Sequence, residues 1–321
     1  MKPFMSVLAI VVLLGVVVAA VAYGLSSDGP AAYSVRGTEV SQQSVDAELT
    51  ELADNHALNA AIKKQRGRPL AATPGSITTQ TSAGWVGLRV ALTAAAQEVD
   101  RRGLTPTKDD GTRGKQLAAE SVGGAAIFAT LSDSFRQDLE ERWTDVAALE
   151  QVVLANPTPA LHRQVARLCP SGRYVSHILV DTQQQASAIK QAIDRGGDFA
   201  RIAASSSKDA SAKNGGRLGC LDGQKFVEPF ATVAATQPIG VVSDPFQTQF
   251  GYHVILVTDQ PAAADVQRVA LEAVLGRVRG ANVTVDARYG AWDRRNGQVV
   301  PPVAPGAVPT TVPLTAPSRG A

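Results

Sequence analysis

The hydrophobic pattern changes at Tyr174, and this change limits the possible folds more than any other feature of the chain. From Tyr174 to Val257, short apolar runs alternate with short amphipathic segments. Strand-like runs occupy 174–180, 218–221, 241–246 and 252–257, while helical spacing follows Thr182, follows Asp198 and covers 226–235. Segments of this length, separated by turn residues, are typical of strands and short helices. We therefore predict an α+β domain over residues 171–260, with the order βααβαββ and a four-stranded, mainly antiparallel sheet.

A longer segment with helical periodicity precedes this domain. Over residues 33–170, apolar side chains recur at helical spacing, most clearly between Ile127 and Leu149. Ser41 is expected to cap a first helix and Gly103 to end a second. Residues 107–114 are polar and are expected to form a loop. The segment is predicted to be a mostly helical domain whose grooves can hold an extended peptide.

The segment after residue 260 has two parts. Apolar spacing over 264–279 predicts a helix, and 282–287 is expected to add an edge strand. Residues 261–295 are therefore expected to pack on the helical domain. The last segment, 296–321, is rich in Pro, Val, Thr and Ala without periodicity, and it is predicted to be disordered.

The N-terminus carries a continuous apolar run from Phe4 to Leu25. A helix of this length crosses a bilayer core of about 30 Å, so residues 1–25 are predicted to anchor the chain in the cytoplasmic membrane. Lys2 favours a cytoplasmic N-terminus, which places the rest of the chain outside, behind a linker at 26–32. The small residues Ala20-Val21-Ala22 leave a second possibility, a cleaved leader and a secreted protein. No cysteine comes directly after the run, which excludes a lipidated cysteine as the anchor.

Charge and cysteine content narrow the classes of function. The formal net charge is +2 and no basic block is present, so nucleic acid is not an expected partner. Cys169 and Cys220 form a pair that is expected to be a disulfide outside the cytoplasm, with two buried thiols as the alternative. His56 and His162 lie far from any ligand at metal spacing, so no metal and no cofactor are expected.

Residues 174–257 also resemble a known family. The matching segments, in order, are Ser176–Val180, Gly197–Phe199 with Ile202–Ala203, Ser207–Ala212, Asn214–Gly219, Pro229–Phe230 and Thr248–His253. Together they resemble the parvulin family of peptidyl-prolyl cis-trans isomerases. Each segment alone is a weak signal, but their common order makes the resemblance specific.

The resemblance implies a role for several side chains. His177 and His253 resemble the paired histidines of the family, with Asp209 and Thr248 in the same hydrogen-bond network. Leu218, Phe226 and Phe230 resemble the apolar pocket for the substrate proline ring, and Phe250 is expected at its rim. Such a set suits the chemistry, because rotation about an X-Pro amide breaks no bond. It needs an apolar socket for the ring and a polar field that favours the twisted amide.

Two positions depart from the family pattern. Arg217 stands where an acidic residue is frequent, and Leu221 stands where an aromatic residue is usual, which is expected to make the pocket shallower. No basic cluster precedes the predicted catalytic loop, so a preference for phosphorylated substrates is not expected.

The layout around this domain resembles the SurA- and PrsA-type foldases, in which a helical chaperone domain surrounds a parvulin insert. The resemblance implies an extracytoplasmic isomerase that acts on unfolded or proline-containing polypeptides. The alternatives are a holdase chaperone whose parvulin domain only binds peptide, and an assembly factor without turnover.

Overall fold

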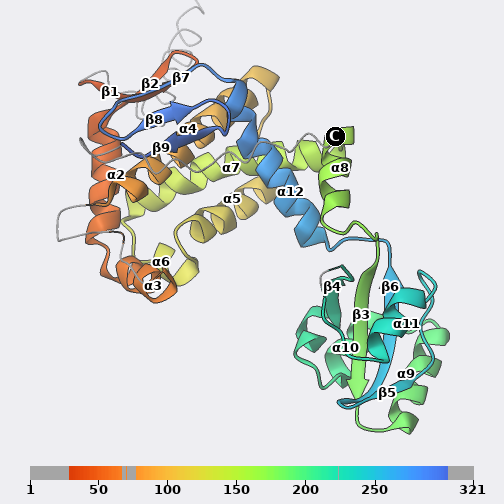
Figure 1. Cartoon of the computed structure of the whole chain (residues 1–321). Helices are drawn as coiled ribbons and strands as arrows, with labels where there is room; N and C mark the ends of the chain where they lie inside the picture. The colour runs from red at the N-terminus through yellow and green to blue at the C-terminus, as the bar shows by residue number, and fades with distance from the viewer. Residues whose placement is uncertain (1–28, 67–69, 71–76, 223, 303–321) are drawn as a thin grey trace, which may run out of the picture. The chain divides into compact units, whose positions relative to one another are not determined.

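The computed structural model of the chain describes residues 29–66, 70, 77–222 and 224–302. The predicted anchor at 1–25 and the end of the predicted tail, 303–321, lie outside these residues. Within the described ranges, no helix has both the length and the apolar character needed to span a bilayer. The chain forms two compact units: an inserted unit, Val153–Ala273, and a helical unit built from the segments on either side of it (Figure 1).

The inserted unit is an α+β fold around one sheet. Its elements are α8 (Pro159–Arg167), β3 (Tyr174–Val180), α9 (Gln183–Asp194), α10 (Phe199–Ser206), the 3₁₀ helix η1 (Ala210–Asn214), β4 (Arg217–Cys220), α11 (Phe230–Thr236), β5 (Phe246–Thr248), β6 (Gly251–Thr258) and most of α12 (Ala263–Leu275). The strand order is β4-β3-β6-β5, and each neighbouring pair is antiparallel. The predicted βααβαββ order and the four-stranded sheet are thus confirmed.

Side-chain alternation gives this sheet two different faces. Ile178, Val180 and Val254 pack with α9 and α10 in one apolar cluster. Val175, Ile255 and Val257 pack with α11 in a second cluster on the opposite face. Because successive strand residues point to opposite faces, the odd-numbered positions of β3 and β6 face α11.

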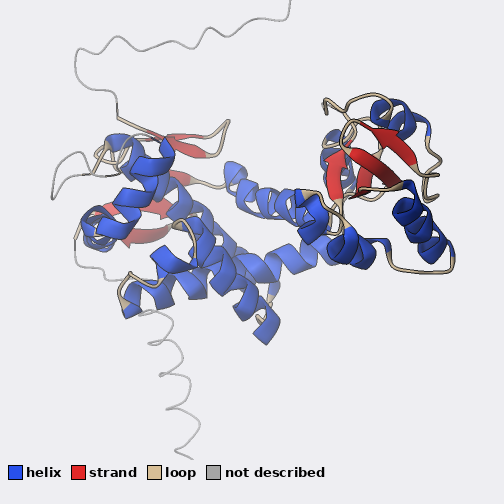
Figure 2. Ribbon diagram, turned by 90° about the horizontal axis from the view of Figure 1, so that it is seen from below, coloured by secondary structure: helices blue, strands red, loops and turns tan. Residues whose placement is uncertain are grey.

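The helical unit combines long helices with two small sheets (Figure 2). Its elements are β1 (Ala31–Val35), β2 (Thr38–Ser41), α2 (Gln42–Asp54), α3 (His56–Arg66), α4 (Thr79–Arg102), α5 (Lys108–Ser121), α6 (Ala125–Phe128), α7 (Asp133–Ala155), the 3₁₀ helix η2 (Gly276–Gly280), β7 (Val283–Val285), β8 (Ala291–Asp293) and β9 (Gln298–Val300). One sheet has the order β2-β1-β7, and the other pairs β8 with β9. Strand β1 therefore lies between a neighbour close in sequence and one from the C-terminal end of the unit. Ser41 and Gly103 cap their helices as predicted.

The helical unit corrects two predictions. The predicted loop at 107–114 is wrong, because α5 begins at Lys108. Thr107 and Asp110 form a reciprocal capping box that stabilises this helix start despite its polar composition. The prediction of disorder from residue 296 is also wrong at Gln298–Val300, where β9 pairs with β8. Val299 is buried there, against α4 at Gly87, and this burial stabilises a strand with no periodic signal.

The inserted unit corrects two element boundaries, both at prolines. The helix predicted over 226–235 starts at Phe230, because the residue before Pro229 is disfavoured in the helical conformation. The strand predicted over 241–246 is reduced to a single bridge at Val242 followed by β5, since Pro245 has no N–H to donate to a ladder.

Candidate active site

The pairing of β3 with β6 brings two histidines together. His177 and His253 both occupy odd positions, so both side chains point to the α11 face of the sheet. In the register, His177 lies opposite Ile255 and His253 lies opposite Leu179, which makes the histidines diagonal neighbours. Diagonal positions on one face are within reach of aromatic side chains. The rings stack with centroids 5.5 Å apart, and both side chains are buried.

A polar chain runs through the two rings. The Nδ1 atoms of His177 and His253 lie 3.3 Å apart, and His253 Nε2 lies 2.8 Å from Thr248 Oγ1. At the other end, His177 Nε2 lies 3.1 Å from the Asp209 carboxylate, although off the line of a well-directed hydrogen bond. The structure therefore brings all four predicted catalytic residues into one network.

The network assigns the protons when both imidazoles are neutral. Thr248 Oγ1 accepts from the Phe250 N–H at 3.1 Å, which leaves its hydroxyl hydrogen free for His253 Nε2. His253 then carries its proton on Nδ1 and donates it to Nδ1 of His177. His177 consequently carries its proton on Nε2, facing the carboxylate of Asp209. Each group thus has a donor or an acceptor that suits its neighbour.

The surroundings favour a neutral His253 and an ionised Asp209. Burial of the imidazole, together with the adjacent His177, lowers the pKa of His253 to about 4. Partial burial opposes ionisation of Asp209, but hydrogen bonds from Ser211 and the contact with His177 outweigh it and lower the pKa to about 2. At neutral pH the network therefore holds a carboxylate, Asp209, next to His177 and a neutral imidazole at His253.

An apolar cavity of about 350 Å³ opens beside the histidines. It is lined by His177, Leu179, Asp209, Leu218, Lys225, Phe226, Val227, Phe230, Phe250 and His253. All four residues predicted for the proline pocket line this cavity. The sequence interpretation missed Leu179, Lys225 and Val227, of which Leu179 was detectable because it shares the face of His177 on β3.

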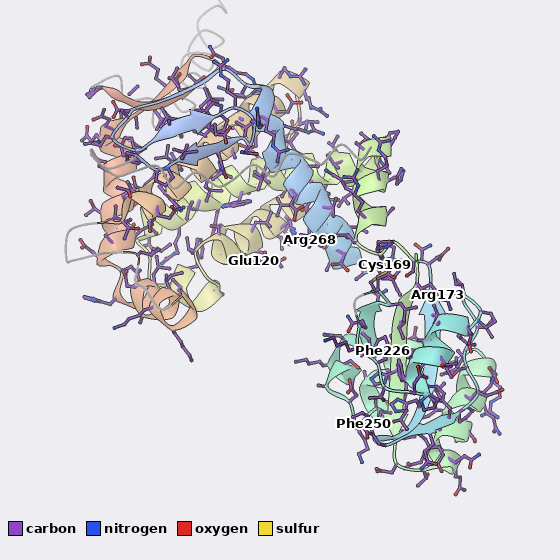
Figure 3. All side chains as sticks on the ribbon, viewed as in Figure 1. Glu120, Cys169, Arg173, Phe226, Phe250 and Arg268 are labelled. Atoms are coloured by element: carbon purple, nitrogen blue, oxygen red, sulfur yellow. A yellow bond between two sulfur atoms is a disulfide. The ribbon has the colours of Figure 1, made fainter. Side chains whose placement is uncertain are left out.

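Phe230 forms the floor of the aromatic part of the site. Its ring packs edge-on against His177 and His253, with centroids 5.6 and 5.2 Å away, and lies 4.7 Å from the ring of Phe226. Phe230 is buried, whereas Phe250 is 61% exposed, which suits a rim position. Both Phe226 and Phe250 are labelled on the inserted unit in Figure 3. Leu221 packs in the cluster around Phe230 and does not line the cavity, so it does not limit the depth of the pocket.

Local contacts fix the loop that carries Asp209. Ser207 Oγ accepts from the backbone N–H groups of Leu179 and Asp209, at 3.1 and 3.3 Å, and the Lys208 N–H donates to the Leu179 carbonyl. The sequence interpretation assigned no role to Ser207 or to Ser211, whose N–H donates to the Asp209 carboxylate at 2.8 Å. The Asp-x-Ser spacing is the signal that indicates this turn.

Close packing beneath the loop requires glycine at position 216. Gly216 has a φ of +78°, and a Cβ there would lie 2.2 Å from the carbonyl oxygen of His177. The Gly216 carbonyl accepts the His177 N–H at 2.8 Å. Glycine at this position therefore allows the backbone at 216 to pack closely against β3, which fixes the position of the His177 ring.

The predicted disulfide is present. Cys169 precedes β3 and Cys220 ends β4, and their Cα atoms lie 5.4 Å apart (Cys169 is labelled in Figure 3). Asp222 lies beside both sulfurs, but bonded cysteines cannot act as thiolate metal ligands. Arg173 Nη2 donates to the Ala234 carbonyl at 3.0 Å, near the C-terminal end of α11, and so fixes the helix that carries Phe230.

The fold and the site define a class. The family model for the rotamase or PPIC-type PPIase domain matches residues 176–259. The segment is a parvulin-type peptidyl-prolyl isomerase domain, as the resemblance implied.

Among known proteins, the domain is related to those of foldases. It is similar to the foldase protein PrsA of Exiguobacterium sibiricum, with 49% identity over 92 residues, 28% of this chain and 30% of the relative. It is also similar to the chaperone SurA of Pseudomonas syringae, with 34% identity over 132 residues, 38% of this chain and 30% of the relative. The matched segments therefore span less than a third of either relative. A crystal structure of PrsA from Bacillus subtilis is 22% identical and covers 69% of this chain and 84% of its own, with a TM-score of 0.33.

Proposed function

We propose that the protein is a foldase that catalyses cis-trans isomerisation of X-Pro bonds in polypeptides outside the cytoplasmic membrane. The proposal depends on one observation, the contact of the His177–His253 pair with an apolar cavity that is large enough for a proline ring. The relatives named foldase and chaperone support polypeptides as substrates. The disulfide supports an oxidising compartment, since such bonds are rare in the cytoplasm.

The site acts on the rotation barrier of the amide. That barrier is about 18–20 kcal/mol and comes from resonance, which is lost when the bond twists. Leu218, Phe226 and Phe230 hold the proline ring, while the rest of the peptide turns against it. The polar chain from Asp209 to Thr248 supplies a fixed field in a water-poor site, where preorganised dipoles stabilise charge redistribution best. No nucleophile is needed, since no covalent bond forms or breaks.

The test is an isomerisation assay on the full chain with a short X-Pro peptide. Phe226→Ala removes a partly exposed wall of the cavity and is expected to lower kcat/KM at least tenfold with the fold retained. Val241→Ala is the matched control, because Val241 is 52% exposed and does not line the cavity. Absence of isomerisation by the wild-type chain, or an equal loss in both variants, would refute the assignment of this site.

A second candidate function is holdase activity without turnover. A cavity of about 710 Å³ in the helical unit favours it. Its apolar wall comes from Ala119 on α5 and from Ala125, Phe128 and Ala129 in and just after α6, while α7 contributes Arg136 and Glu140. Ala129→Glu would place a charge in this cavity, and Ala126→Glu is the control on a neighbouring exposed position outside it. Loss of aggregation suppression in the first variant alone, with no isomerisation by the wild type, would favour the holdase.

A further inference from the structure

The helical unit carries a concentration of positive charge that the isomerase site does not use. Seven exposed arginines lie on η2 or on segments joined to it, and we call them the η2 arginine cluster: Arg36, Arg101, Arg102, Arg277, Arg279, Arg294 and Arg295. Helix η2 is only five residues long, so it spans about 10 Å. Arg277 and Arg279 therefore lie on one short segment, to which the other five arginines are connected by contacts.

A single carboxylate organises one half of the cluster. Glu98 accepts hydrogen bonds from Arg101 and Arg102, each at 2.6 Å, and lies 3.7 Å from Arg277. The hydrogen bond from Arg101, reinforced by Arg102 against some burial, lowers the pKa of Glu98 to about 2. Burial, together with Arg102 and Arg101, lowers the pKa of Arg277, as expected where guanidinium groups outnumber their counter-charge.

The other arginines are joined to η2 from two directions. The Arg36 N–H donates to Asn282 just beyond η2, and Arg36 lines a cavity of about 200 Å³ with Glu98 and Arg277. Arg279 Nε donates to the carbonyl of Asn296 at 3.2 Å, in the turn between β8 and β9.

That turn adds two more arginines to the cluster, beside Asp293, whose pKa is lowered by hydrogen bonds from Asn296 and also by Arg295. Arg294 and Arg295 form no ion pair with a carboxylate among the residues that the structure describes. The nearby Asp293 carboxylate already accepts from the N–H groups of Arg295 and Asn296. Glu98 and Asp293 are thus the carboxylates that the contacts place within the cluster. The sequence outside the described residues adds one acid, Asp28, so the chain has no acidic segment there to cover these arginines.

We propose that the η2 arginine cluster docks the helical unit on a membrane surface that carries anionic phospholipid headgroups. Guanidinium groups bind phosphate oxygens in a bidentate manner, and each basic side chain near an anionic surface adds to binding. This proposal goes beyond the isomerase function and does not depend on it. It depends on insertion of the apolar run Phe4–Leu25 in the membrane.

The length of the chain favours a membrane over an acidic protein. The five residues 26–30 separate the apolar run from β1 and reach at most about 18 Å. Strand β1 adds about 17 Å before the turn that carries Arg36. Once the apolar run is inserted, these two short segments keep the cluster close to the bilayer. This tether raises the effective concentration of the arginines at the lipid headgroups.

The experiment uses the full chain with Gln298→Cys, an exposed position on β9 next to the cluster. Its thiol can be labelled selectively, because the two native cysteines are bonded to each other. A donor dye is attached to this thiol, and the efficiency of energy transfer from it to acceptor dyes on lipid headgroups is measured. The vesicles contain phosphatidylcholine alone or an equal mixture with phosphatidylglycerol. We expect higher transfer in the mixed vesicles, and loss of the difference in about 1 M NaCl, where the Debye length is about 3 Å.

A charge-matched pair of variants tests the location. Arg279→Gln with Arg294→Gln and Arg295→Gln is expected to reduce the docked-to-undocked ratio at least about tenfold. The same change at Arg163, Arg167 and Arg195, exposed positions in the inserted unit, is expected to leave the ratio unchanged.

Four outcomes would overturn the proposal. Equal transfer in both lipid compositions would show that the cluster does not recognise anionic headgroups, and equal effects of the two triple variants would reduce the effect to net charge. If the protein does not float with either kind of vesicle in a density gradient, the apolar run is not inserted and the membrane tether is absent. Polyglutamate that abolishes transfer at low concentration, without any dependence on lipid charge, would indicate an acidic polypeptide as the partner instead.

Discussion

Protonation of His253 should destabilise the inserted unit in mildly acidic solution. The imidazole is 3% exposed and lies between the rings of His177, Phe230 and Phe246. Burial of the imidazole, with the adjacent His177, lowers its pKa to about 4, against about 6.5 for an unfolded chain. The unfolded state therefore binds more protons between these values. The neutral ring contributes stability that is fully present above pH 6.5 and is lost as the pH falls through 4.

The size of the effect follows from the two pKa values. A shift of this size corresponds to a total of about 3 kcal/mol, of which about 2 kcal/mol is lost between pH 7 and pH 5. The opening equilibrium of the sheet should therefore increase about thirtyfold over this range. The pKa of Asp209 is also lowered, but its stabilisation is lost between about 3.8 and 2, below the range of the experiment.

Hydrogen exchange of the β3 and β6 amides in the full chain measures this equilibrium, after correction for intrinsic exchange rates. His253→Gln should abolish most of the dependence on pH, while His162→Gln, at an exposed position on α8, should retain it. A protection factor that stays constant from pH 7 to pH 5, or the same slope in the His253 variant, would refute a buried neutral imidazole as the cause.

Three further predictions concern stability. Cys169 and Cys220 are separated by 51 residues in the sequence, and replacing both by serine opens the loop that their disulfide closes. The free energy of opening of β3, measured by hydrogen exchange, should fall by about 2–4 kcal/mol. Equal protection of β3 in both forms would contradict this. Gly216→Ala should destabilise the inserted unit at least about 2 kcal/mol more than Gly240→Ala in the same assay, since both positions have positive φ but only the first meets a strand carbonyl; equal costs would refute the packing argument. Burial and neighbouring carboxylates raise the pKa of Asp145 from 3.8 to about 6, so Asp145→Asn should stabilise the helical unit by about 3 kcal/mol at pH 7 and by less than about 1 kcal/mol near pH 4. Denaturation followed by tryptophan fluorescence measures this gain, because all three tryptophans lie in the helical unit, and an unchanged midpoint at pH 7 would contradict it.

Local signals predicted the part of the fold that positions the site. The run Tyr174–Val180 is rich in apolar and β-branched residues, so it predicts a strand, and its period places His177 on a defined face. Thr182 and Asp198 cap the two helices that follow, as their side chains predicted. The pairing of the two histidines came from the family resemblance, because no local pattern specifies which strands are neighbours.

The failures come from contacts between distant segments. Strand β9 has no periodic signal of its own and forms because Val299 is buried against α4, more than two hundred residues earlier in the chain. Arg89 is a second example, because nothing in the local sequence of α4 indicates that this arginine is buried. The structure buries it completely against Glu48 and Asp138, at 3.1 and 2.9 Å. Neither result follows from the composition of the local window.

The antiparallel pairing of β1 with both β2 and β7 has a consequence for biosynthesis. Tyr33 meets Val285 in this sheet, so its last strand leaves the ribosome only after the whole parvulin domain has been made. Nascent chains usually complete their domains from the N-terminal end, but here the later domain has all of its residues first. The unit that begins first is therefore the last to receive all of its strands.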